Sequence, residues 1–294
     1  MGTSSSSTKS RPRTEQYVPR QRASRSRGGS LARPRNDSRN GIQRRSSNRK
    51  NSWGRFNPTI VQGGSLETWS FPSVDIDKVK VRLVTQGRPM NANVELWQGP
   101  DNSPQKMAVY IEDGNYRPFS ALVATPRGSN AIAVRNTANL EFPLAACVEP
   151  ENGDAGLWDI FDGPDDYRLA RTVQGGSVHT IPFAPEVESV QLLLKTDGRP
   201  LNARVELLQG PNNNKQVIDI HTEDGMERPF LAVIETPGVG NVIRMINMAT
   251  MEFPMTAYVE PFEVQPGYIY DASYMQRGTG GGYGSSNIQG GWYK

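Results

Sequence analysis

Histidine, cysteine and paired carboxylates are the side chains that could give this sequence acid–base, nucleophilic or metal chemistry. The chain has two histidines, His179 and His221, and one cysteine, Cys147. A metal site needs three or four such ligands, and a nucleophile needs a base held beside it. Two separated histidines and a cysteine inside an apolar run supply neither set. The sequence therefore predicts no catalytic, metal or cofactor site, and Cys147 is expected to be a small buried hydrophobic side chain.

Two further motifs have a chemical and a structural interpretation. Glu112-Asp113-Gly114 and Glu223-Asp224-Gly225 offer paired carboxylates, which suit acid–base catalysis or a calcium ion. We interpret them as hairpin turns that need glycine at positive φ. Gln-Gly-Gly-Ser, at residues 62–65 and 174–177, lacks the lysine and the following Ser/Thr of a phosphate-binding loop. A glycine turn or bulge is the favoured interpretation of this motif.

These motifs occur twice because the chain contains a tandem repeat. Residues 87–100, Gly-Arg-Pro-Met-Asn-Ala-Asn-Val-Glu-Leu-Trp-Gln-Gly-Pro, recur nearly unchanged at 198–211, an interval of 111. The same interval separates the two copies of Glu-Asp-Gly, Arg-Pro-Phe and Glu-Phe-Pro, whereas the Gln-Gly-Gly-Ser copies are 112 apart. One insertion therefore interrupts two otherwise collinear copies, each long enough for a domain of its own.

The overall charge of +3 hides a strong asymmetry along the chain. Residues 1–56 contain fifteen lysines and arginines against Glu15 and Asp37, so this arm carries +13 and leaves −10 on the remainder. The arm nearly lacks aliphatic residues, and we predict that it is disordered. A flexible polycation binds acidic surfaces and nucleic acid. Its Arg-rich, Ser-rich, acid-poor composition is also typical of an organelle transit peptide.

Short apolar strands fill both copies. Lys78 to Leu83 alternates polar and apolar residues with period two, which predicts Val79, Val81 and Leu83 on a core face. Several such runs, closed by Gly, Pro, Asn and Asp, indicate about seven or eight strands per copy. The expected fold is all-β: two tandem homologous antiparallel β-sandwiches, 57–150 and 167–262, packed as a pseudo-dimer. No apolar run approaches 18 residues, so no membrane span is predicted.

The segments outside the repeats differ in character. The linker, 151–166, is wholly acidic but contains Leu157, Trp158, Ile160 and Phe161, and we expect this apolar group to pack against a repeat. In the second copy, Val190 to Leu194 is apolar on both faces, as in a sheet that is covered on both sides. The Gly-rich and Ser-rich tail, 263–294, is predicted to bind neighbouring copies through its aromatic residues. The residues predicted to make this contact are Tyr268, Tyr270, Tyr274 and Trp292.

Polar residues that both copies retain are candidates for buried or interface contacts, since exposed charges drift freely. Lys80 and Arg82 of the first copy, for example, are replaced by Gln191 and Leu193 in the second. We expect Arg88 and Arg117 to bond to carboxylates within the fold or across a subunit contact. The ten candidates for such contacts are Arg88, Asn91, Glu95, Asp113, Arg117, Arg199, Asn202, Glu206, Asp224 and Arg228.

The repeated motifs resemble those of the pyrenoid shell proteins of diatoms and related algae. The resemblance covers residues 57–262 and depends mainly on the long motif at 87–100 and 198–211. It implies a non-enzymatic protein of two related β-domains, located at the pyrenoid periphery in the chloroplast stroma. There it would form a sheet around the Rubisco matrix and support CO2 fixation.

Self-assembly is therefore the expected function, with the chain itself as main partner. The aromatic tail would join neighbouring copies, and the basic arm would face an acidic partner such as Rubisco. Two alternatives stay open. An Arg-rich arm before a β-sandwich also suits a virus-like capsid protein that packages nucleic acid, and paired carboxylates on a β-sandwich suit a carbohydrate-binding or hydrolytic module.

Overall fold

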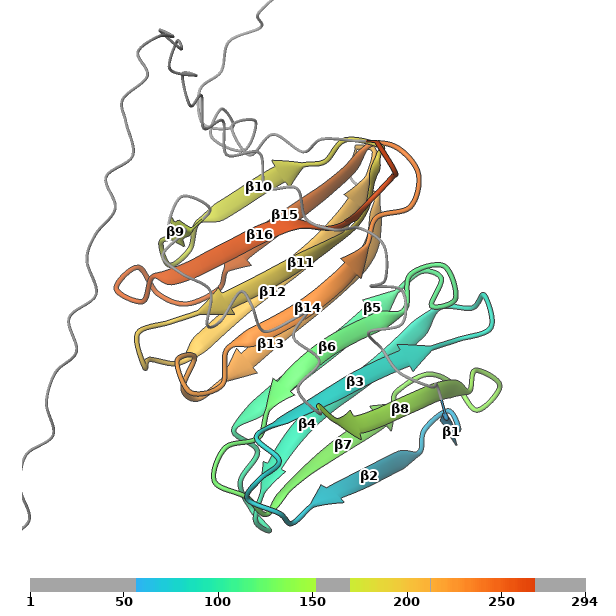
Figure 1. The fold of residues 1–294 in the computed structure, drawn as a ribbon, viewed down its shortest axis with the longest axis vertical. Helices are drawn as coiled ribbons and strands as arrows, with labels where there is room; N and C mark the ends of the chain where they lie inside the picture. Colours follow the sequence, from blue (N-terminus) through green and yellow to red (C-terminus); the bar gives the residue numbers. More distant parts are fainter. Residues whose placement is uncertain (1–56, 152–169, 212, 268–294) are drawn as a thin grey trace, which may run out of the picture. The chain divides into compact units, whose positions relative to one another are not determined.

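A computed structural model describes residues 57–151, 170–211 and 213–267, which form sixteen β-strands (Figure 1). The strands of the first copy are β1 (Thr59–Val61), β2 (Leu66–Phe71), β3 (Lys78–Val84), β4 (Met90–Gln98), β5 (Gln105–Ile111), β6 (Phe119–Ala124), β7 (Asn130–Asn136) and β8 (Leu144–Pro150). Those of the second are β9 (Arg171–Val173), β10 (Val178–Pro182), β11 (Val187–Lys195), β12 (Leu201–Gln209), β13 (Asn214–Thr222), β14 (Phe230–Glu235), β15 (Asn241–Asn247) and β16 (Met255–Val264). The prediction of seven or eight strands per copy is confirmed, and the last strand ends two residues beyond the expected boundary at 262.

The strands form two antiparallel sheets, and each copy contributes four strands to each sheet. Sheet A has the order β1-β8-β3-β6-β14-β11-β16-β9, and sheet B has the order β10-β15-β12-β13-β5-β4-β7-β2. Within the first copy the orders β1-β8-β3-β6 and β2-β7-β4-β5 are those of a jelly roll, the double Greek key of two four-stranded sheets. The second copy repeats this order, so the all-β sandwich prediction is confirmed.

Both sheets continue from one copy into the other across a seam with two-fold pseudo-symmetry. In sheet B, β5 pairs with β13 and Ala108 lies opposite Asp219. In sheet A, β6 pairs with β14 and Ala121 lies opposite Ala232. The residues of each pair are 111 positions apart, the interval of the repeat, so each is the equivalent of its partner. The pseudo-dimer is therefore joined by main-chain hydrogen bonds as well as by side chains.

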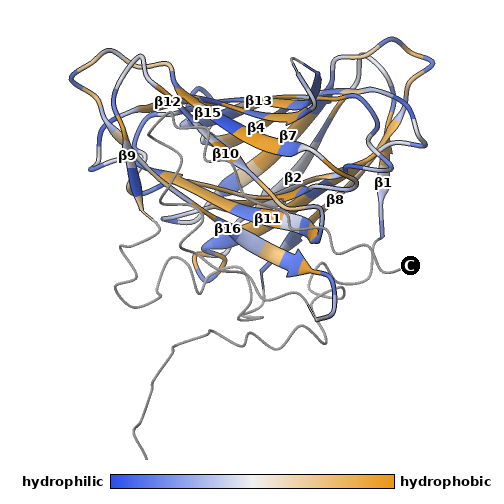
Figure 2. Cartoon of the chain, turned by 90° about the horizontal axis from the view of Figure 1, so that it is seen from above, coloured by the Kyte–Doolittle hydropathy of each residue, from blue (hydrophilic) through white to orange (hydrophobic). Residues whose placement is uncertain are grey.

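The space between the two sheets is filled by one hydrophobic core that runs through both copies. The alternation in β3 places Val79, Val81 and Leu83 in this core with no exposed surface, as predicted. Figure 2 shows the sheets as two layers whose strands carry hydrophobic residues. The largest fully buried side chains include Phe119 and its equivalent Phe230. Repeated core positions thus explain why both copies keep the same strand order.

The Gln-Gly-Gly-Ser motifs form the tight turns that we predicted. The amide of Ser65 donates to the carbonyl of Gln62 at 3.0 Å, and Gly64 has a φ of 79°. A Cβ on the neighbouring Gly63 would stand 1.8 Å from the carbonyl oxygen of Asn139, so only glycine fits beside that loop. The second copy has the same geometry.

Several expectations concern residues outside the described ranges. These are the basic arm, the apolar group of the linker and the four aromatic residues chosen in the tail. They remain predictions. In the described part of the chain, no helix is long and apolar enough to cross a membrane.

Candidate functional site

The structure keeps apart the side chains that could do nucleophilic or metal chemistry. His179 lies on β10 and His221 on β13, and two strands of sheet B separate them. Cys147 lies on β8 in the other sheet, where it is buried as predicted, and burial raises the pKa of its thiol. Among the described residues no group of three or more His, Cys, Asp or Glu side chains could hold a metal ion.

The acidic pairs shape the connections that carry the chain from sheet B to sheet A. The Oδ1 of Asp113 accepts the amides of Asn115 and Tyr116 at 2.9 and 3.0 Å, and Asp224 does the same in the second copy. This is an Asx-type turn, in which the side chain replaces a backbone acceptor. Both aspartates are thus committed to main-chain contacts.

The prediction of hairpin turns was wrong, because each of these turns joins strands of different sheets, and so was the expected reason for glycine. Neither Gly114 nor Gly225 has a positive φ. Instead, a Cβ on Gly114 would stand 2.5 Å from the Oγ1 of Thr85, and a Cβ on Gly225 would stand 2.5 Å from the Oγ1 of Thr196. Glycine is required here by close packing against the residue that directly follows β3 or β11, and not by backbone conformation.

Two retained arginines bind across the seam between the copies. Arg117 donates from Nη2 to the Oε1 of Gln209 at 2.9 Å, and its equivalent Arg228 donates to Gln98 at 2.8 Å. Both arginines have 5% of their surface exposed. The acceptor across the seam is an amide oxygen in each case, where a carboxylate was expected for Arg117. Burial is the main reason that the pKa of Arg117 lies below its ordinary value.

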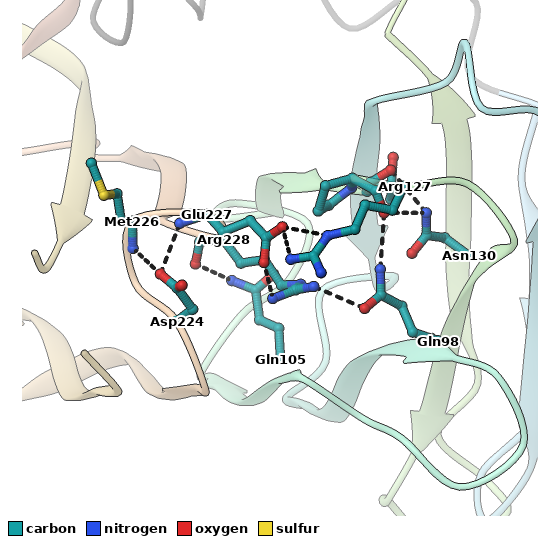
Figure 3. A network of polar contacts seen from close by, with 10 residues as sticks. Gln98, Gln105, Arg127, Asn130, Asp224, Met226, Glu227 and Arg228 are labelled. Carbon is teal, nitrogen blue, oxygen red and sulfur yellow. Dashed lines mark hydrogen bonds and ion pairs between the residues drawn. The ribbon is translucent and has the colours of Figure 1, made fainter. Parts of the chain in front are cut away.

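Side chains around one of these contacts form a larger polar network (Figure 3). Arg127 of the first copy donates through Nε to Glu227 of the second at 2.7 Å. Glu227 also contacts Arg228, with 2.8 Å between Oε2 and Nη1. The hydrogen bond from Arg127 lowers the pKa of Glu227, so this carboxylate stays ionised near neutral pH.

The opposite end of the seam has a different composition. Lys215 of the second copy contacts Glu112 of the first, with 2.5 Å between Nζ and Oε2. Arg117 also lies over the ring of Tyr116, 5.2 Å from its centroid. The guanidinium–glutamine contacts are therefore symmetric, whereas the ion pairs added to them are not.

The other retained arginines hold the loop before the last strand of each copy. Arg88 lies over the ring of Phe142, 5.3 Å from its centroid, and Arg199 lies over Phe253 at 5.4 Å. Arg199 also donates to the carbonyl of Glu252 at 2.9 Å. These cation–π contacts tie the retained Gly-Arg-Pro and Glu-Phe-Pro motifs together. Both arginines are exposed, and the contact described for Arg88 is a ring rather than the expected carboxylate.

The remaining retained residues lie on β4 and β12, in sheet B. The carbonyls of Asn91 and Asn202 accept the amides of Thr137 and Met248 at 3.0 and 2.8 Å. The carboxylates of the two retained glutamates have different partners. Glu95 accepts from the indole of Trp97 at 2.8 Å. Glu206 binds Arg244.

A comparison with protein families identifies the chain. The model of the family described as diatom pyrenoid shell protein matches residues 50–261, which is more than half of the sequence. The chain belongs to the diatom pyrenoid shell protein family. The family name indicates a structural role in a shell and a location in the chloroplast pyrenoid.

Other comparisons add little to this assignment. No curated protein matches the sequence. Among solved structures, the PBSX exported protein XepA is 11% identical with a TM-score of 0.25, over 70% of this chain and 85% of that one. An oxalate decarboxylase is 8% identical with a TM-score of 0.20, over 72% and 68%. Vicilin from Capsicum annuum is 8% identical with a TM-score of 0.17, over 68% and 75%. Similarities this weak carry no argument about the shell protein.

Sequence reasoning did not single out two pairs of residues that matter in this shell protein. Gln98 and Gln209 accept hydrogen bonds from the seam arginines, and both stand within the long repeated motif. Asn136 is 1% exposed and donates to the carbonyls of Val61 and Phe142 at 3.0 and 2.8 Å. Asn247 makes the equivalent contacts in the second copy. Retention at an interval of 111 was the signal that could have found all four.

Replacing Arg117 with alanine tests the seam. The substitution removes a buried donor and leaves the Gln209 amide without it, so we expect the free energy of unfolding to fall by about 1–3 kcal/mol. Arg135→Ala is the matched control, since Arg135 is an exposed arginine on β7, and its effect should stay within about 0.5 kcal/mol. Urea unfolding of both variants measures the difference. Equal effects of the two substitutions would contradict the role given to Arg117.

Proposed function

We propose that this chain is a non-enzymatic structural protein whose copies assemble into a sheet around the Rubisco matrix of the pyrenoid, supporting CO2 fixation. Family membership supports the shell role. The observation that carries the proposal of self-assembly is a pair of exposed apolar side chains at equivalent positions. Leu140 and Met251 are 75% and 77% exposed, at the tips of the loops that precede β8 and β16.

Single exposed apolar residues are common on protein surfaces, but these two occupy equivalent loop tips in both repeats, which makes them candidates for contacts between molecules. The loops that present them are held in place by the Arg88–Phe142 and Arg199–Phe253 contacts. Since β6 and β14 run antiparallel across the seam, equivalent loops lie at opposite ends of the strands. Each molecule therefore presents one apolar tip at either end. Contacts of this kind suit open assembly, in which each unit binds neighbours on opposite sides.

Charged substitutions at both tips should weaken assembly of the full chain. Burial of one large apolar side chain stabilises a contact by roughly 1.5–3 kcal/mol, so Leu140→Asp with Met251→Asp should raise the assembly concentration at least about tenfold. Val74→Asp is the matched control, because Val74 is 73% exposed and lies in the stretch without an equivalent in the second copy. Electron microscopy and light scattering report sheets or tubes. Unchanged assembly of the double variant would sink the role of the tips.

The aromatic tail is the second proposed contact between molecules. Tyr268, Tyr270, Tyr274 and Trp292 lie beyond the last described strand, so their removal spares the sixteen strands. A chain ending at Gly267 should keep the melting temperature of the full chain but fail to form extended sheets. Microscopy of both chains at matched concentrations measures this outcome. Sheets of normal extent from the shortened chain would mean that the tail is not needed.

A capsid-like role remains the second candidate, because jelly rolls are common in viral capsids and the arm carries +13. In the shell proposal this arm faces an acidic protein such as Rubisco; in the second it binds nucleic acid. We expect Rubisco to co-sediment with the full chain at low salt, and the binding to be lost without residues 1–56 or at high salt. Particles that instead retain nucleic acid through purification, and release it at high salt, would favour the capsid-like role.

A further inference from the structure

The outer face of sheet A carries a second apolar cluster, separate from the core between the sheets. Its members are Leu122, Leu193, Leu231, Val233 and Phe262, with Tyr258 packed against them. The first four are at most 3% exposed. All sixteen described strands belong to the two sheets, and sheet B covers the opposite face, so no described strand covers this one. Val190 to Leu194 was predicted to be covered on both sides, and its burial agrees with that prediction.

The apolar cluster forms a continuous row across the seam. Lys80 pairs with Leu122, Leu122 with Leu231, Leu231 with Leu193, and Leu193 with Tyr258. This row runs at right angles to the strands, from β3 in the first copy to β16 in the second. It ends in a basic side chain at Lys80, and Lys195 lies over the Tyr258 ring at the other end, 5.2 Å from its centroid.

The connection between the copies starts and finishes at the two ends of this row. Glu151 follows β8; its amide donates to the carbonyl of Lys78 at 2.9 Å and its carboxylate contacts Lys80 at 2.5 Å. The chain resumes at Ala170, next to Arg171, which pairs with Ala257 on β16. β8 is second and β9 is eighth in sheet A, so six strand spacings separate them, about 29 Å. Residues 152–169 can span up to about 60 Å, so a direct crossing of the face is within reach.

The order of apolar and charged residues along the connection complements the order along the row. Its apolar residues, Leu157, Trp158, Ile160 and Phe161, stand at its middle, as Leu122 and Leu231 stand at the middle of the row. Asp159 stands within that group and the other acidic residues stand on either side of it, and the row is basic toward both ends. The face also contains buried polar atoms without a hydrogen-bond partner, the Oγ atoms of Ser120 and Ser189. A peptide lying on the face offers main-chain groups to such atoms.

We propose that residues 157–161 lie across the outer face of sheet A, over Leu122, Leu231 and Leu193, and brace the two jelly rolls against each other. The connection is thus a third layer over the seam. This assignment is independent of the shell proposal, since it concerns one chain. It also leaves the outer face of sheet B and the loop tips as the surfaces open to other molecules.

Thiol labelling of a single introduced cysteine tests the proposal in the full chain. Ser120→Cys, with Cys147→Ser, places a thiol on the covered face with little change in volume. We expect slow labelling in this protein and a rate at least tenfold higher when Trp158→Ser and Phe161→Ser are added. Val123→Cys is the matched control, because Val123 lies on the same strand but faces the core, and its rate should stay unchanged.

Four results would overturn the assignment. Fast labelling of Cys-substituted Ser120 in the otherwise intact chain would show that the face is open. Acceleration by removal of residues 268–294, but not by the linker substitutions, would assign the face to the tail. Protection that disappears on dilution of the intact chain would show that a second molecule covers the face. Equal acceleration at positions 120 and 123 would also count against a local brace, because loss of a surface layer should not open the core.

Discussion

The structure depends on main-chain hydrogen bonding across the seam between the two copies. A jelly roll alone would end at β5 and β6, and these strands would present unpaired amides and carbonyls. In this chain they pair with β13 and β14, so two four-stranded sheets become two sheets of eight and the cores merge. Unpaired edge strands invite uncontrolled association, and pairing them within the chain removes that hazard at the centre of the molecule. The arginine–glutamine contacts then fix the register that the main chain permits.

Sequence alone was sufficient for the strands and for the symmetry. Period-two alternation in Lys78–Val84 reports which side chains face the core because successive side chains of a strand point to opposite faces of the sheet. The interval of 111 shows which polar residues are constrained, but it does not say by what. Arg117 and Arg88 are retained equally, yet one binds an amide across the seam and the other stacks on a ring. Their partners come from other strands and loops, and the sequence pattern of one element does not specify those distances.

The two copies share an interior but have diverged at the surface. Glu95 and Glu206 occupy equivalent positions, and one accepts from an indole whereas the other pairs with an arginine. Glu227 makes an ion pair with Arg127, but their equivalents, Tyr116 and Gly238, cannot. Surface residues of a tandem duplication can diverge in this way because each of these surface contacts is made only once in the chain. Core residues are constrained in both repeats, because both have the same fold. The molecule consequently has two chemically distinct halves.

Sheet A ends in strands of only three residues, β1 on one side and β9 on the other. So short a ladder offers few hydrogen bonds to an incoming strand, which disfavours growth of the sheet by strand addition. In the assembly proposed above, molecules that meet at these edges would be held by side-chain contacts between folded molecules, and they could separate without unfolding. A compartment boundary that must be remodelled as its contents grow benefits from this property, because cross-β polymers are kinetically trapped.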